Sequence, residues 1–249
     1  MRLKLTIAYD GANYEGWQVQ KVGVGVQQKV EEAIARIFQV QVRVHGSSRT
    51  DTGVHARAMI AHFDLPQDRL RMKLSKVRLA LNAALPEDIR VMAARKVPES
   101  FHARFNAKGK EYRYYVYNFP AMNPLLRRQA WHVPQKLDLA AMRAATGFFE
   151  GKQDFAAFAN NRNYKMESTV RTLFRCRIRK SGPLLTFIIE GEGFLYKMCR
   201  GIVGTLVQVG LGRYAVEDIP RMLAARDRRM AGMTAPAHGL VLWKVFYDQ

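Results

Sequence analysis

Two kinds of apolar spacing alternate along this chain in an order that recurs, and that order limits the folds the chain can adopt. Apolar residues at every second position indicate strands, and apolar residues three or four positions apart indicate helices. In the first half the elements run strand, helix, strand, strand, helix, strand, at residues 3–9, 26–38, 40–44, 59–63, 70–84 and 89–97. This β-α-β-β-α-β order is typical of a ferredoxin-like unit.

The same order returns in the second half, after a connector at residues 98–109. Strands are expected from Tyr112 onward, at 170–180, at 184–191 and at 239–247, and helices at 137–148, 194–209 and 216–226. We therefore predict an α+β fold with two ferredoxin-like halves, residues 1–107 and 108–249. The halves are expected to join into one extended, mostly antiparallel sheet with a central cleft.

The charge of the chain indicates a polyanionic partner. Its 249 residues include 40 Lys and Arg against 21 Asp and Glu, a formal net charge of +19, which favours nucleic acid or an anionic membrane surface. No apolar run approaches the roughly 20 residues of a membrane span, and the N-terminus lacks the apolar core of a signal peptide. We expect a cytoplasmic protein that binds nucleic acid and no membrane.

The cysteines and histidines predict neither a disulfide nor a metal site. Cys176 and Cys199 lie within the apolar patterns of an expected strand and an expected helix. The six histidines show no spacing typical of metal ligands. We therefore expect no bound metal.

A loop with reactive side chains is predicted between the expected strands at 40–44 and 59–63. Residues 46–53 contain two glycines, two serines, two threonines, Arg49 and Asp51. Glycines permit sharp turns, and short polar side chains bond to nearby backbone. The residues alone leave two interpretations of Asp51. It is either a carboxylate that bonds its own turn, or a nucleophile kept ionised by the guanidinium of Arg49.

This loop resembles the active-site signature of the tRNA pseudouridine synthase A family, which usually reads Gly-Ala-Gly-Arg-Thr-Asp-Ala-Gly-Val-His. The Arg-Thr-Asp core and the Gly-Val-His end are intact, whereas Ser47, Ser48 and Thr52 depart from the usual residues. These three are small, so we expect altered bonding within the loop and not a lost site. Further motifs resemble those of the family, in the same order along nearly the whole chain: Tyr9-Asp10-Gly11, Gly16-Trp17-Gln18, Phe101-His102-Ala103-Arg104-Phe105, Tyr112-Arg113-Tyr114, Phe194-Leu195-Tyr196-Lys197-Met198 and Gly239-Leu240.

The resemblance implies a tRNA pseudouridine synthase that acts in the anticodon stem-loop, at tRNA positions 38, 39 and 40. It also implies a homodimer that needs no cofactor. Asp51 would be the nucleophile, and Arg49 would help to hold the flipped nucleotide. Tyr112 would stack on the target base, Arg200 would keep Asp51 ionised, and Leu240 would line the pocket.

Three segments are candidates for RNA contact. The resemblance implies two of them, one of which is Arg162, Asn163, Tyr164 and Lys165 in the polar stretch 160–165. The other is Phe101, His102, Ala103, Arg104 and Phe105, which the residues alone would equally describe as core phenylalanines beside surface charge. The third follows from the residues, because Arg175, Arg177 and Arg179 alternate along an expected strand and share one face. Like charges on one face repel each other, and a polyanion would relieve that repulsion.

Two other functions are compatible with parts of the sequence. A non-catalytic RNA-binding protein with two RRM-like halves would explain the charge and the element order, but gives no reason for the Arg-Thr-Asp loop. A metal-dependent nuclease could use Asp10, Asp51 and Asp64, provided that the fold brings these carboxylates together.

Overall fold

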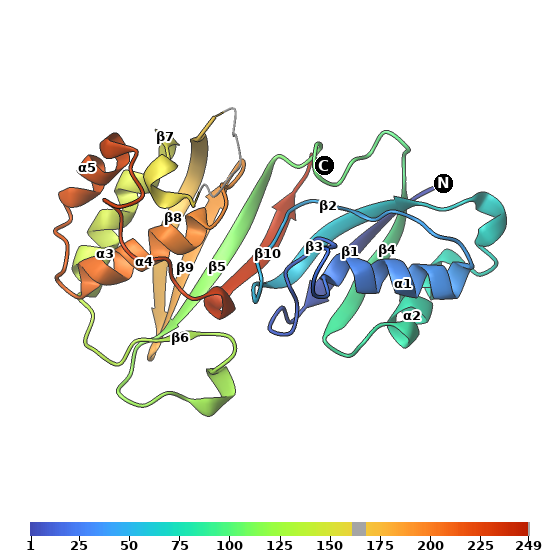
Figure 1. The fold of residues 1–249 in the computed structure, drawn as a ribbon, viewed down its shortest axis with the longest axis horizontal. Helices are drawn as coiled ribbons and strands as arrows, with labels where there is room; N and C mark the ends of the chain where they lie inside the picture. The colour runs from blue at the N-terminus through green and yellow to red at the C-terminus, as the bar shows by residue number, and fades with distance from the viewer. Residues whose placement is uncertain (161–167, 249) are drawn as a thin grey trace. The chain divides into compact units, whose positions relative to one another are not determined.

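The computed structural model describes residues 1–160 and 168–248, and the chain divides into two compact units. Unit 1 is Met1–Lys108 together with Val241–Gln249, and unit 2 is Gly109–Leu240. The last strand, β10 (Leu240–Phe246), returns to unit 1, where it pairs with β3 (His55–Asp64) (Figure 1). Each unit is a mostly antiparallel sheet with helices packed against it.

Unit 1 has the strand order of a ferredoxin-like domain. In addition to β3 and β10 it contains β1 (Arg2–Tyr9), α1 (Val26–Phe38), β2 (His45–Gly46), α2 (Leu74–Ala84) and β4 (Ile89–Val97). The sheet order is β4-β1-β3-β10, and the short strand β2 pairs with the far end of β3. β1 is antiparallel to both of its neighbours, and β10 is parallel to β3 over Val241 and Leu242.

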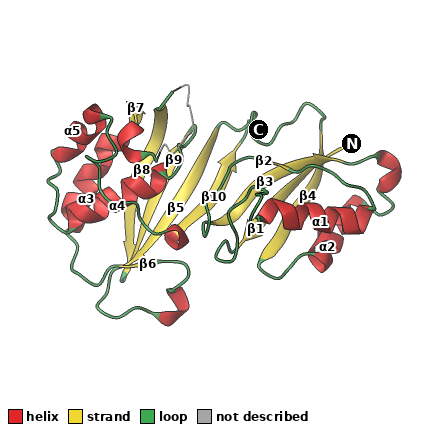
Figure 2. Ribbon diagram, viewed as in Figure 1, coloured by secondary structure: helices red, strands yellow, loops and turns green. Residues whose placement is uncertain are grey.

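Alternation in the strands and helical spacing in α1 direct one apolar face of each element into the core of unit 1. Leu3, Leu5 and Ile7 are fully buried, and the strand register places Leu3 opposite Phe63 and Ile7 opposite Met59. α1 contributes Val26, Val30, Ile34 and Phe38 to the same core. Figure 2 shows α1 and α2 on one side of this sheet.

Unit 2 repeats the pattern with additions. Its elements are β5 (Gly109–Tyr117), β6 (Trp131–His132), α3 (Leu139–Thr146), β7 (Gly151–Asp154), β8 (Val170–Ser181), β9 (Leu184–Gly191), α4 (Met198–Gly210) and α5 (Asp218–Ala225). The sheet order is β5-β9-β8-β7, and β6 pairs in parallel with β5. Short 3-10 helices lie at Gln67–Arg69 in unit 1 and at Pro124–Leu126, Gly147–Phe149, Ala156–Phe158 and Ala237–Gly239 in unit 2.

The structure confirms the predicted fold class, α+β with two mostly antiparallel ferredoxin-like halves. It draws the boundary one residue later than expected, at Lys108, and assigns the closing strand from Val241 on to unit 1. The strand predicted at 40–44 is wrong. The amide of Val44 donates to the Glu31 carboxylate at 2.8 Å, so that backbone group is used on α1 and not in a sheet.

The expected helix at 194–209 begins four residues later, at Met198. The cause is local, because Lys197 adopts a left-handed backbone conformation with φ +60°, which an α-helix does not permit. The expected helix at 70–84 likewise begins at Leu74. The short strands β6 and β7 carry too few residues to show an alternating pattern in the sequence.

Candidate active site

Asp51 lies on the loop that connects β2 to β3, so both ends of this loop are fixed by strands of unit 1. At its start the amide of Ser47 donates to the carbonyl of Ile60 at 2.7 Å, and Ser47 is fully buried. Within the loop the amide of Val54 donates to the carbonyl of Asp51 at 3.1 Å. Asp51 is half-buried between the buried Thr50 and the exposed Thr52, and Arg49 is exposed. The Asp51 side chain is therefore partly accessible, and the backbone that carries it is held in place.

A second loop, residues 10–17, lies directly against the backbone of the Asp51 loop. The amide of Trp17 donates to the carbonyl of Thr50 at 3.1 Å, and the amide of Gly53 donates to the carbonyl of Tyr14 at 3.3 Å. Gly16 has φ +84°, and a Cβ there would overlap the Thr50 carbonyl oxygen, so this position requires glycine. A Cβ on Gly11 would likewise lie 2.0 Å from the Val54 carbonyl oxygen, so close backbone approach accounts for the glycines of both opening motifs.

The three carboxylates of the nuclease hypothesis do not converge. Asp10 lies 3.0 Å from Nδ1 of His55, at the first residue of β3. Asp64 ends the same strand, nine residues on, which corresponds to about 30 Å of extended chain. There it accepts two hydrogen bonds from Arg2, at 2.8 and 2.7 Å, and this guanidinium lowers the pKa of the Asp64 carboxyl. Two-metal chemistry needs carboxylates that share one site, so this arrangement does not support a nuclease.

Among the described residues, no group of three or more His, Cys, Asp or Glu side chains is arranged to hold a metal ion. In the same part of the chain, no helix is both long enough and apolar enough to cross a membrane.

The other predicted catalytic residues belong to unit 2. Tyr112 is a buried residue of β5, opposite Ile189, and its ring packs edge-on against Phe194 with the centroids 5.0 Å apart. Arg200 lies in the first turn of α4 and is half-buried. Its Nε donates to the carbonyl of Ala235 at 2.7 Å, and the amide of Ala235 donates back to the Arg200 carbonyl at 3.0 Å. Arg200 thus holds the segment that leads to the start of β10.

Tyr114 has a structural role in unit 2 that the sequence did not reveal. Its hydroxyl donates to the carbonyl of Pro236 at 2.8 Å, and a Cβ on Gly239 would lie 2.5 Å from the tyrosine ring. Burial raises the pKa of this hydroxyl, so Tyr114 stays a neutral donor. Arg200 and Tyr114 therefore hold residues 235–239 at two points, and Leu240 follows directly as a buried residue. The Tyr-Arg-Tyr and Gly-Leu motifs were the available signals for this contact.

The predicted segment 101–105 divides into an anchored part and an exposed part. Ala103 is fully buried and its amide donates to Nδ1 of His62 at 3.1 Å, while Phe101 packs on Tyr247 with the ring centroids 5.3 Å apart. Arg104 and Phe105 are exposed. The ring of His102 stacks on that of Phe105 at 4.2 Å. Arg104 and Phe105 are thus the side chains of this segment most available to a ligand.

The ring of His102 lies against two other histidine rings, those of His45 and His62. His62 lies 5.0 Å from His45 and 4.7 Å from His102, measured between ring centroids. Burial, followed by the charges of His102, Arg2 and His45, lowers the pKa of His62 to about 4, while Asp64 acts in the opposite direction. Burial also lowers the pKa of His102. The bond from the Ala103 amide requires an unprotonated His62 Nδ1.

We predict that protonation of His62 at acidic pH lowers the stability of unit 1. Since its pKa is lower in the folded state than the ordinary 6.5, its contribution is complete above pH 6.5 and is lost as the pH falls toward 4. His62→Gln cannot be protonated, yet its amide oxygen can accept from Ala103. Thermal melting between pH 7 and 4 should show a smaller loss of Tm for His62→Gln than for the unmodified protein. Parallel Tm curves would contradict this account.

The three arginines of β8 share an exposed face as predicted, but two of them have carboxylate partners. Arg175 lies 3.2 Å from Glu190, its neighbour in the strand register, and Arg177 pairs with Glu150. Their mutual repulsion is therefore smaller than the sequence suggests. The candidate residues Arg162, Asn163, Tyr164 and Lys165 lie outside the residues that the structure describes.

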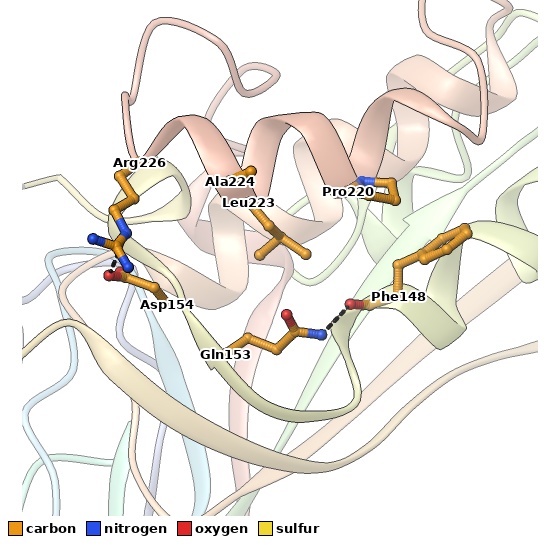
Figure 3. Close-up of a pocket in the computed structure, with 7 residues that line it drawn as sticks. All are labelled: Phe148, Gln153, Asp154, Pro220, Leu223, Ala224 and Arg226. Carbon is orange, nitrogen blue, oxygen red and sulfur yellow. Dashed lines mark hydrogen bonds and ion pairs between the residues drawn. The ribbon is translucent and has the colours of Figure 1, made fainter.

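A pocket of about 500 Å³ in unit 2 contains none of the predicted site residues (Figure 3). Pro220, Leu223 and Ala224 of α5 line it together with Phe148, Gln153, Asp154 and Arg226. Its single acid, Asp154, is ion-paired with Arg226 at 3.0 Å, and the Gln153 amide donates to the carbonyl of Phe148 at 2.8 Å. The pocket offers no activated nucleophile.

Two ferredoxin-like units, one of which carries an Arg-Thr-Asp loop with its backbone held on both sides, agree with the fold expected of a pseudouridine synthase. A family model described as tRNA pseudouridine synthase matches residues 5–106 and 145–248. The chain belongs to this family of isomerases.

Similar proteins carry a more specific name. Proteins named tRNA pseudouridine synthase A are 41% identical over 251 residues in Ruminiclostridium cellulolyticum, 43% over 250 residues in Bacillus pumilus and 47% over 253 residues in Solidesulfovibrio magneticus. These alignments cover 99%, 100% and 99% of this chain, and 99%, 100% and 91% of the respective relatives.

Proposed function

We propose that this protein isomerises uridine to pseudouridine in the anticodon stem-loop of tRNA, at positions 38, 39 and 40. The observation that carries the proposal is Asp51, a half-buried residue on a loop that is hydrogen-bonded to residues 10–17. The chain that carries this loop belongs to the tRNA pseudouridine synthase family. The net charge of +19 suits a tRNA substrate.

In the proposed reaction the C1′–N1 glycosidic bond breaks, the uracil turns, and a C1′–C5 bond forms. N1 gains a proton and C5 loses one, so there is no redox change and no group leaves the nucleotide. The residues of the chain suffice for this chemistry, and we propose that no cofactor takes part. A base within a paired stem cannot be reached, so the target nucleotide must first be flipped out.

We propose a part in this reaction for each predicted catalytic residue and for Leu240. Asp51 acts as the nucleophile, and Arg49, exposed two residues away, holds the flipped nucleotide. Tyr112 stacks on the base and assists the proton transfer at C5. Arg200 keeps Asp51 ionised, and Leu240 lines the pocket. The anchoring of residues 235–239 by Arg200 and Tyr114 supports the placement of Leu240.

One experiment separates the proposed function from the two rivals. The protein is incubated with tRNA labelled with tritium at uracil C5, in EDTA, and both tritium release and tRNA length are measured. A synthase releases tritium and leaves the tRNA intact, because no metal is needed. An RNA-binding protein releases nothing, and a metal-dependent nuclease is silent in EDTA but cuts the tRNA when Mg²⁺ is restored.

We further propose that the exposed arginines of β8 bind tRNA phosphates. Binding should weaken by roughly tenfold for every few phosphates neutralised as salt rises from low to moderate. Replacing Arg175, Arg177 and Arg179 together with serine should flatten the salt dependence, measured by filter binding. The charges of Arg175 and Arg177 are already partly neutralised by Glu190 and Glu150. Arg179→Ser alone should therefore account for much of the change in the salt dependence. An unchanged slope in the triple variant would remove this face from the RNA interface.

The remaining parts of the proposal concern assembly and location. We propose a cytoplasmic homodimer in which one tRNA reaches both subunits, as the resemblance to the family implies. Light scattering should then report twice the chain mass of 28.5 kDa. A fully active monomer at every concentration would contradict this.

A further inference from the structure

One buried hydrogen bond connects β1 directly to the residue before Asp51. The hydroxyl of Tyr9 and the Oγ1 of Thr50 are 2.7 Å apart, and both side chains are buried. Tyr9 is the last residue of β1, where it is paired with Ile89 of β4 and Ala56 of β3. Its ring also lies against Trp17, with the centroids 6.1 Å apart. Because the backbone of Tyr9 is paired with a strand on each side, its side chain has a fixed base from which to hold the loop.

Thr50 is fixed from the opposite direction as well. Its carbonyl accepts from the amide of Trp17 at 3.1 Å, so both its side chain and its backbone are bound. On the other side of Asp51, the hydroxyl of Thr52 donates to the Glu15 carboxylate at 2.9 Å. Asp51 is therefore flanked by two residues whose hydroxyls are both held by groups outside the loop.

We infer that Tyr9 is a positioning residue for the reaction, which acts through Thr50 to set the direction of the Asp51 carboxylate. This inference rests on the proposed role of Asp51 as the nucleophile. An attacking group must be held close to its productive geometry, and a displacement of about 1 Å can cost about a hundredfold in rate. Thr50 is covalently next to Asp51, so a rotation of the Thr50 backbone turns the carboxylate directly.

Removal of one hydroxyl tests this inference. Tyr9→Phe keeps the ring and its packing on Trp17. We expect kcat for tritium release to fall about tenfold or more, with KM and tRNA affinity changed less than about twofold, because affinity comes mostly from phosphate contacts elsewhere. Thr50→Val should lower kcat to the same extent, whereas Thr50→Ser should retain it, because serine keeps the hydroxyl.

The double variant decides whether Tyr9 acts through Thr50. Tyr9→Phe combined with Thr50→Val should lose no more kcat than either single variant, because both changes remove the same hydrogen bond. If kcat of the double variant fell by the product of the two single losses, the inference would be overturned. Wild-type kcat in Tyr9→Phe, or an effect confined to KM, would also overturn it. Thr146→Val is the matched control. It removes a buried hydroxyl bond to the Arg143 carbonyl in α3, and its kcat should stay unchanged.

A second measurement does not depend on turnover. Hydrogen exchange should be faster in Tyr9→Phe than in the unmodified protein at two amides, that of Gly53, which donates to Tyr14, and that of Trp17, which donates to Thr50. Both bonds would open more often, and peptides covering residues 47–54 and 10–18 report the two amides. Unchanged exchange there would show that Tyr9 does not hold the loop. If the unmodified protein released no tritium, the proposed function would fail, while the exchange data would still report whether Tyr9 restrains the loop.

Discussion

Asp51→Asn is expected to abolish pseudouridine formation while leaving tRNA binding intact. An amide has nearly the shape of the carboxylate but is not a nucleophile of comparable strength. The backbone carbonyl of Asp51, which accepts from Val54, is unchanged, so the turn should persist. Tritium release should fall below detection, and filter binding on the same preparation should match the unmodified protein, because phosphate contacts supply most of the affinity.

A matched control variant distinguishes a catalytic effect of Asp51→Asn from an effect on folding. Asp138→Asn makes the same change at a carboxylate outside the proposed site, which accepts a backbone N–H bond from Ala141 at the start of α3. Asparagine is an equally good cap at that position, so this control should keep full activity. Near-normal release from Asp51→Asn would leave Asp51 as an ordinary turn residue. Loss of both release and binding, with a lowered Tm, would indicate misfolding.

Arg200→Met is expected to cause the second largest loss of turnover. Methionine is a good helix former of similar length, so α4 should persist. The variant removes the charge proposed to keep Asp51 ionised, and also the bond from Nε to the Ala235 carbonyl. The charge effect should be partly reversed as pH rises, because a carboxylate without a cationic partner ionises at higher pH. The loss of the anchor should not depend on pH.

Two further variants identify which of these effects dominates. Arg200→Lys keeps the positive charge but lacks the planar guanidinium, so it should recover part of the turnover at neutral pH if charge is decisive. Arg143→Met removes an arginine that donates to the Ile178 carbonyl from α3, and serves as the control without a proposed role. Wild-type turnover in Arg200→Met at neutral pH would exclude Arg200 from the site.

Sequence alone determined the order of the elements, the two-fold recurrence of that order and the position of the Asp51 loop. These features depend on local periodicity, which reports the buried face of a strand or helix wherever that face is directed. The family resemblance followed from contiguous motifs, which are also local. For this reason the fold class and the family are both confirmed, although helix starts shifted by four residues at Met198 and at Leu74.

Tertiary structure decided which distant segments meet. The pairing of β10 with β3, the use of the Val44 amide by Glu31 and the burial of Ala103 on His62 all join residues that are far apart in sequence. The acidic partners of Arg175 and Arg177 also come from other strands or loops. Such contacts depend on strand register and on the side chains that close each turn. Composition and spacing do not encode those contacts, so the bond between Tyr9 and Thr50 became visible only in the folded chain.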